Sequence, residues 1–312
     1  MIICCGEALI DFIALPDGLS HRPCPGGSIL NIAVGLGRLQ VPVRFLSRLS
    51  TDMFGDLLAD YLKKNNVSLE YCPRVDGQTT LAFVSLPREA AQEPQFAFYA
   101  NGAVDRSLTI NDLPAEFGEE VAALHFGSIS LVLEPGATAL ETLMKRESHR
   151  RILTLDPNVR PALIPDKEAY KQRFLKWISL VDILRLSVAD LEFLYPHQEI
   201  EALLPQWFGS GLSLVILTRG AEGVSGYTAN GTVVFVPAQK VQVKDTVGAG
   251  DSFFSAALAW LYDYGLLSRR SALDQITQDE LKACLTFAGK AAAINCTREG
   301  ANPPYKSEMQ GQ

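Results

Sequence analysis

Short apolar runs alternate with helix-like segments between residues 122 and 217. The runs predict buried strands, and the longer segments between them predict helices. Because strands that alternate with helices usually pair in parallel, this pattern predicts a parallel sheet covered by helices. The expected strands are 122–127, 151–155, 181–186 and 213–217, and the expected helices are 135–146, 166–178, 188–194 and 199–209.

The chain begins with an apolar run that predicts one buried strand over residues 1–10. Gly26 and Gly27 then precede Ser28 and an apolar stripe at i, i+3, i+4 spacing over residues 29–39. This arrangement predicts a helix with Ser28 as its N-cap. Elsewhere we expect a strand at 43–49, a helix at 56–65, a β meander at 224–228 and 233–237, and long helices at 251–264 and 277–295.

Two segments differ from the strands of a sheet that is buried on both faces. Large apolar residues alternate over 79–86 and 95–100, which predicts a hairpin with a loop at 87–94. Together with the Pro-rich stretch 12–25, these strands are expected to form a small separate sheet. No Pro/Gly/Ser linker divides the chain, so residues 1–312 are interpreted as one α/β domain, with 12–25 and 79–100 inserted as a lid.

The composition and charge of the chain exclude several classes of binding partner. The 312 residues are 47% apolar and 20% charged, with a net charge of −7, and the sequence pI is about 5.2. Because basic runs are missing, nucleic acid and anionic membranes are not expected partners. No apolar stretch is long enough for a membrane span. The N-terminus lacks signal-peptide features and the cysteines show no metal or disulfide spacing, so a reduced, cytoplasmic protein is expected.

The clearest chemical motif is a glycine turn that leads into an apolar helix. In this turn, Gly248-Ala249-Gly250 is followed at once by Asp251. Small residues let successive backbone N–H groups point to one spot, and a helix start adds partial positive charge there, which suits an anion such as a phosphoryl group. The Asp251 carboxylate could take a proton from a substrate hydroxyl. From spacing alone, an ordinary turn with Asp251 as N-cap is an equally good interpretation.

Three weaker signals lie near expected strand ends or helix starts. Gly26 and Gly27 allow close backbone approach, and Asn31 on the first helical turn can donate and accept, which suits a polyol. Asp11 and Arg160 each follow an expected strand, where ligands of open parallel sheets bind. A plain helix entry and solvated surface turns remain alternatives. Motifs of P-loop NTPases, protein kinases and serine hydrolases do not occur in the sequence.

These residues resemble the ribokinase-like (PfkB-type) carbohydrate kinases along nearly the whole chain. Gly26-Gly27 with Asn31 is similar to the first signature of that family, and 245–253 is closely similar to the second. Within the family, the segments 6–11, 125–128 and 156–161 look most like fructokinases. The resemblance implies a three-layer α/β/α fold with a mostly parallel central sheet and a small β-sheet lid.

The resemblance also implies ATP, Mg²⁺ and transfer of the γ-phosphoryl group to a sugar hydroxyl. It makes Asp251 the catalytic base and Gly248, Ala249 and Gly250 the anion hole. The residues implied for the sugar are Asp11, Gly26, Gly27 and Asn31, with Phe98 and Arg160 as further pocket residues.

For the nucleotide, the resemblance implies Thr218, Gly220, Gly223 and Asn295, together with Ser187. The family usually has Asn-x-x-Glu where this chain has Ser187-Val188-Ala189-Asp190; Asp190 could still order Mg²⁺ through water. A K⁺ site used by some members aligns with Asp245, Val247, Asn295, Arg298 and Gly300, although Pro304 stands where some of them have a serine.

The expected reaction is phosphorylation of D-fructose to D-fructose 6-phosphate. The alternatives are a sibling kinase acting on 2-keto-3-deoxygluconate, ribose or a riboside, and a non-catalytic sugar- or nucleotide-binding relative. Because a small sheet buries only one face against its own domain, and relatives often pair their lids, we also expect a homodimer joined through the lid.

Overall fold

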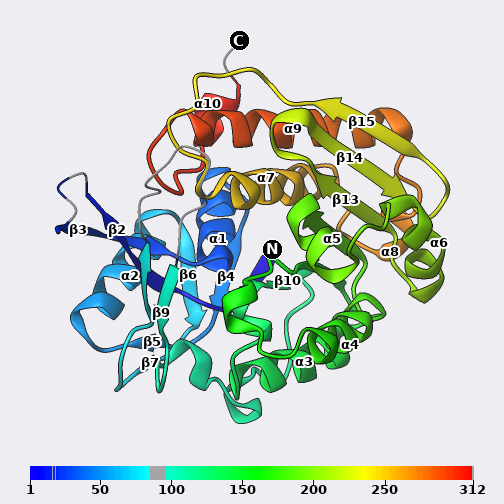
Figure 1. Ribbon diagram of the computed structural model, residues 1–312. Coiled ribbons are helices and arrows are strands. Elements are labelled where there is room, and N and C mark those ends of the chain that lie inside the picture. The colour runs from blue at the N-terminus through cyan, green and yellow to red at the C-terminus, as the bar shows by residue number, and fades with distance from the viewer. Residues whose placement is uncertain (16, 18, 85–95, 311–312) are drawn as a thin grey trace.

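The computed structural model describes residues 1–15, 17, 19–84 and 96–310 (Figure 1). Its main element is a nine-stranded sheet in the order β15-β14-β13-β12-β11-β10-β1-β4-β6. All its pairs are parallel except β13–β14 and β14–β15. The strands are β1 (Ile2–Cys5), β4 (Val43–Leu46), β6 (Val67–Tyr71), β10 (Ala123–Gly127), β11 (Ile152–Asp156), β12 (Ile183–Ser187), β13 (Leu214–Thr218), β14 (Gly223–Thr228) and β15 (Val233–Pro237).

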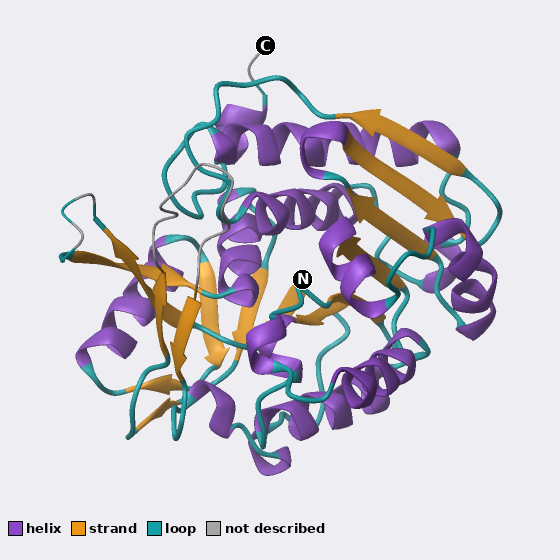
Figure 2. Ribbon diagram, viewed as in Figure 1, coloured by secondary structure: helices purple, strands orange, loops and turns teal. Residues whose placement is uncertain are grey.

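Helices cover both faces of this sheet, which gives the expected three layers (Figures 1 and 2). One face carries α1 (Ser28–Arg38), α2 (Met53–Lys64), α7 (Ala249–Asp263) and α9 (Gln278–Cys296). The other carries α3 (Gly136–Glu147), α4 (Lys167–Ile178), α5 (Val188–Leu194) and α6 (Ile200–Ser210). Successive side chains of a strand point to opposite faces, so Ile2 packs in the first core and Ile3 in the second. No described helix is both long and apolar enough to cross a membrane.

The opening of the chain corrects one prediction. The apolar run expected as one strand over residues 1–10 is broken at Gly6, and β2 (Leu9–Ala14) belongs to another sheet. Gly6 has φ 154°, and a Cβ there would meet Ile29 at 2.7 Å, so the chain turns where only glycine fits. Hydropathy could not reveal this break, because the residues on both sides of it are buried.

The second sheet has four strands in the order β3-β2-β8-β9, with β3 (His21–Gly26), β8 (Leu81–Val84) and β9 (Phe96–Tyr99). β8 and β9 form the expected antiparallel hairpin; its predicted loop lies outside the described residues. β3 is an edge strand, which explains how it tolerates two prolines. The sheet packs beside α2, at one side of the molecule (Figure 1).

The two faces of this small sheet differ in character. Phe12 stacks on Phe83 with ring centroids 4.9 Å apart, and Phe83 meets Tyr99 edge-on at 5.5 Å. The neighbouring positions Asp11 and Ala82 are paired across β2 and β8, and their side chains point to the opposite face. One face is therefore aromatic, and the other carries the predicted sugar-binding carboxylate.

The remaining elements are short. The pair β5 (Leu49–Ser50) and β7 (Arg74–Val75) and the helices α8 (Arg270–Leu273) and α10 (Lys306–Met309) were not predicted, nor was β6. The predicted strand at 43–49 is divided between β4 and β5, and α2 begins three residues before the expected start at 56.

Candidate functional site

The glycine turn and Asp251 form the start of α7. Gly248 is the N-cap in the left-handed region, with φ 73°, so Asp251 lies within the first turn and is not the N-cap. A Cβ on Gly248 would meet Ala301 at 2.5 Å. The hydrogen bonds of the described residues include none donated by the backbone N–H of Gly250 or Asp251. These two donors at the N-terminus of a 15-residue helix suit an anion.

The first turn of α1 holds the carboxylate of Asp251. The Ser28 hydroxyl donates to Asp251 Oδ1 at 2.7 Å, and Asn31 Nδ2 donates to Oδ2 at 2.8 Å. The sequence analysis assigned Asn31 to the sugar-binding residues and did not place Ser28 among the site residues. The structure places both beside the predicted base, which is buried with 7% exposure.

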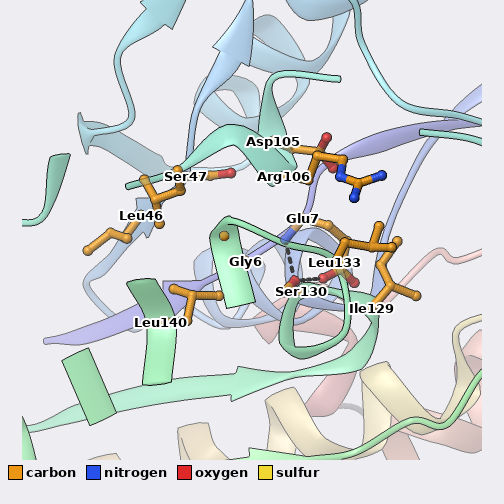
Figure 3. Close-up of a pocket in the computed structure, with 12 residues that line it drawn as sticks. Gly6, Glu7, Leu46, Ser47, Asp105, Arg106, Ile129, Ser130, Leu133 and Leu140 are labelled. Atoms are coloured by element: carbon orange, nitrogen blue, oxygen red, sulfur yellow. Dashed lines mark hydrogen bonds between the residues drawn. The ribbon is translucent and has the colours of Figure 1, made fainter. Parts of the chain in front are cut away.

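Ser28 does not cap α1 as predicted, because Glu7 takes that role. Glu7 Oε1 accepts from the backbone N–H of Ser28 at 2.9 Å and of Ile29 at 3.4 Å. Ser130 donates to Glu7 Oε2 and accepts from the Glu7 N–H at 2.8 Å (Figure 3). Burial raises the pKa of Glu7 to about 7, against the opposing effect of these hydrogen bonds. The figure also shows a small pocket beside Glu7, lined by Asp105 among others.

Arg160 and Asp251 both act electrostatically on Asp11, although the three residues come from distant parts of the chain. Burial raises the pKa of Asp11 to about 7; the Arg160 charge opposes this rise and the Asp251 charge adds to it. Gly26 is required here, since a Cβ on Gly26 would collide with the Asp11 carboxylate. Gly27 has φ 102° and makes the turn from β3 into α1. Asn31 thus contacts Asp251, Gly26 lies against Asp11, and Gly27 leads into the turn of α1 that holds Asp251.

Arg160 and Phe98 complete the predicted sugar set. Arg160 Nη1 donates to the Asn158 side chain at 2.6 Å and to backbone carbonyls of the same turn, which fixes its guanidinium near Asp11. Phe98 on β9 is paired with Ala82 and packs into a small apolar cluster with Leu9 and Ile129. Phe98 thus lies on the same face of the small sheet as Asp11.

A buried arginine that sequence reasoning missed lies beneath the glycine turn. Arg185 Nη1 forms an ion pair with Asp156 Oδ2 at 2.7 Å, and Nη2 donates to Thr218 Oγ1 at 2.7 Å. A Cβ on Gly250 would lie 2.7 Å from Arg185 Nη2. Burial raises the pKa of Asp156 to about 7, opposed by the Arg185 charge. In the sequence, the one sign of this buried ion pair was that Arg185 is a charged residue inside an otherwise apolar predicted strand.

Ser187 and Asp190 form a capping box at the start of α5. Asp190 Oδ2 accepts from the Ser187 backbone N–H at 2.7 Å and from its hydroxyl at 2.6 Å, while Oδ1 accepts from Val159 N–H at 2.7 Å. Both carboxylate oxygens thus already have protein donors. The described residues contain no group of three or more His, Cys, Asp or Glu side chains that could hold a metal ion. The role of Asp190 in ordering Mg²⁺ stays a prediction.

The predicted nucleotide residues separate into two groups. Thr218 ends β13, and Gly220 and Gly223, with φ 55° and 131°, shape the exposed turn that follows. Asn295 instead is fully buried: Nδ2 donates to Val247 O at 2.8 Å and Oδ1 accepts from Ser252 Oγ at 3.0 Å. Asn295 therefore supports the loop before α7. Its assignment to the nucleotide site stays a prediction.

The residues aligned with a K⁺ site lie together at the other end of this loop. Asp245 Oδ1 accepts from Val247 N–H at 3.0 Å, and Oδ2 accepts from Gly300 N–H at 2.8 Å. Arg298 donates to Asn302 O at 3.5 Å and pairs with Glu308. The Asp245 carboxylate thus links the loop before α7 to the segment after α9.

Comparison with known proteins identifies the chain. The profile described as pfkB family carbohydrate kinase matches residues 1–308. A fructokinase of Rhizobium leguminosarum bv. trifolii is 40% identical over 280 residues, covering 88% of this chain and 84% of that protein. The fold and these similarities define a carbohydrate kinase. The chain belongs to the pfkB family.

Solved structures agree with this assignment. A fructokinase from Xylella fastidiosa with bound ATP is 30% identical, with a TM-score of 0.90 over 99% of this chain and 96% of that one. A fructokinase from Vibrio cholerae O395, with fructose, ADP and a calcium ion bound, is 25% identical, with a TM-score of 0.82. The match covers 96% of this chain and 94% of that chain. The ribokinase-like three-layer fold is confirmed.

Proposed function

We propose that this protein is an ATP-dependent fructokinase that converts D-fructose to D-fructose 6-phosphate. The observation that carries the proposal is the contact of Asn31 with the Asp251 carboxylate at 2.8 Å, which joins the first turn of α1 to the start of α7. A carboxylate that can take a proton here faces groups that can bind polyol hydroxyls. The choice of fructose is supported by the similarity to fructokinases of bacteria and plants.

In the proposed mechanism, Asp251 accepts the proton of the acceptor hydroxyl. The acceptor oxygen forms its bond to the γ-phosphorus, the bond from that phosphorus to the bridging oxygen breaks, and ADP leaves. Phosphoryl transfer depends mainly on alignment and on neutralised charge. The N–H groups of Gly250 and Asp251 are oriented to receive the transferred group. Asp11, Asn31 and Arg160, with Gly26, Gly27 and Phe98, surround the acceptor.

The proposed nucleotide site runs from the glycine turn to the loop after β13. Arg185 holds Thr218 beneath Gly250, so a positive charge lies under the place proposed for the phosphates. Gly220, Gly223 and Ser187 border this region. Mg²⁺ would supply charge neutralisation to the triphosphate when bound. A monovalent cation such as K⁺ would have the carboxylate of Asp245 and the carbonyls near it as oxygen donors.

The small sheet is proposed to be a lid that excludes water from the acceptor and joins two subunits. Asp11 and Phe98 share the face toward the site, whereas Phe12, Phe83 and Tyr99 form the other face. Phe12 packs edge-on against Phe54 of α2, but Tyr99 is 65% exposed, and exposed aromatic surface on a small sheet is usually covered. A second copy related by a two-fold axis would cover it. A cytoplasmic location remains part of the same proposal.

An acceptor screen tests the proposed function. Purified protein with Mg-ATP is offered D-fructose, ribose, 2-keto-3-deoxygluconate and a riboside, and ADP release is measured. Fructose should give the highest kcat/KM. A higher value for another acceptor would replace fructose in this proposal, and ATP hydrolysis without any phosphorylated sugar would overturn it.

A further inference from the structure

The hydroxyl of Ser28 is buried, and it neither caps α1 nor belongs to the residues predicted to bind the sugar. Ser28 is the first residue of α1 and is 6% exposed. Its backbone N–H is held by Glu7 at 2.9 Å, and α1 has no side-chain cap from its N-cap residue. The hydroxyl is therefore not needed for helix capping, and its proton goes to Asp251 Oδ1 at 2.7 Å.

Asp251 is surrounded by charges of both signs. Asp11 on β2 and Asp156 at the end of β11 are acidic, and Arg185 on β12 is basic; all three interact electrostatically with Asp251. Both side-chain donors to Asp251, Ser28 and Asn31, come from one turn of α1.

We propose that Ser28 is a positioning residue for the base of phosphoryl transfer. Its hydroxyl fixes one carboxylate oxygen of Asp251, so that the carboxylate is held in place to accept the proton. Glu7 determines where this hydroxyl lies, because it holds the Ser28 N–H. The inference rests on the proposed role of Asp251 and extends it to a residue that is assigned neither to the sugar nor to the nucleotide.

Ser28→Ala removes only the hydroxyl and keeps the backbone N–H that Glu7 binds. A hydrogen bond to a charged group is strong enough that kcat should fall by about 10- to 100-fold. KM for fructose and ATP should stay within about twofold, so that the loss lies in kcat. Ser28→Cys, whose thiol is a weak donor, should give the same direction of change.

Ser255→Ala is the matched control. Ser255 is a buried serine of α7 whose hydroxyl donates only to the Ser252 carbonyl at 3.0 Å. The control should keep the wild-type kcat. Thermal unfolding of all three variants separates loss of folding from loss of turnover.

Three outcomes would overturn the inference: unchanged kcat in Ser28→Ala, an equal loss in Ser255→Ala, or a change confined to KM. The proposed function fails in a different way. If the wild type prefers another sugar, the same comparison is made with that sugar. If Asp251→Asn keeps its turnover, the base itself is wrongly assigned.

Discussion

The side-chain amide of Asn31 donates to Asp251 Oδ2 across 2.8 Å, although 220 positions separate the two residues. Asn31 belongs to the first family signature and Asp251 to the second. Their contact brings the first turns of α1 and α7 together, so the two signatures form one site. Asn31 therefore contacts the proposed base, in addition to its proposed role in binding the sugar.

Asp251→Asn should fold normally and lose most turnover, since it removes the proton acceptor but keeps the shape and the oxygen that Ser28 binds. Loss of a general base typically costs about 10²–10⁴-fold in rate. Steady-state kinetics with fructose and ATP measures the effect. A variant that keeps more than roughly a tenth of the wild-type kcat would remove Asp251 from this role.

Asp11→Ala should raise KM for the sugar far more than KM for ATP, because Asp11 is assigned to acceptor hydroxyls alone. Gly26→Ala should act in the same direction, since its Cβ would displace the Asp11 carboxylate. Gly209→Ala is the control, because an added Cβ there meets nothing within 4 Å. Equal changes in both KM values would show that Asp11 is wrongly assigned.

Arg185→Met should strongly destabilise the protein, because it leaves Asp156 buried without its partner. Breaking a buried ion pair costs about 3–5 kcal/mol. The double variant with Asp156→Asn should recover part of this loss, which urea denaturation can measure. Arg22→Met, at an exposed ion pair with Glu299, is the control. An Arg185 variant no less stable than this control would contradict the assigned pairing.

Glu7 should make stability fall as pH rises. Its pKa is about 7 in the folded protein against 4.5 when unperturbed. Between these values the folded chain keeps a proton that the unfolded chain releases, so the contribution is full below 4.5 and is lost as pH passes about 7. Glu7→Gln should flatten this part of the stability curve between about pH 5 and 8. The exposed Glu222→Gln should leave it unchanged.

The protein should sediment as a dimer of the 34.1 kDa chain at micromolar concentration. Tyr99→Asp places a charge on the aromatic face of the small sheet and should shift the equilibrium to monomer. Tyr264→Asp is a matched control, because Tyr264 is 64% exposed and Tyr99 is 65% exposed. A single species of monomer mass in the wild type would refute the lid interface.

The strands and helices between residues 122 and 217 were predictable because each apolar run matches one buried strand. The break at Gly6 was not, since a buried run looks the same whether it forms one strand or two. The motif residues around Asp251 could be predicted from their types and spacing. Ser28, Glu7 and Arg185 could not, because their roles depend on contacts between segments far apart in the sequence.

The packing of α1 against α7 has a consequence for synthesis. Ten of the eleven residues of α1 are buried, and much of the surface that covers them lies on α7. The ribosome makes α1 early and α7 only after most of the chain. Until then the apolar stripe of α1 lacks this cover, and the emerging polypeptide must avoid association with other chains. Premature termination before α7 should therefore give an aggregating product.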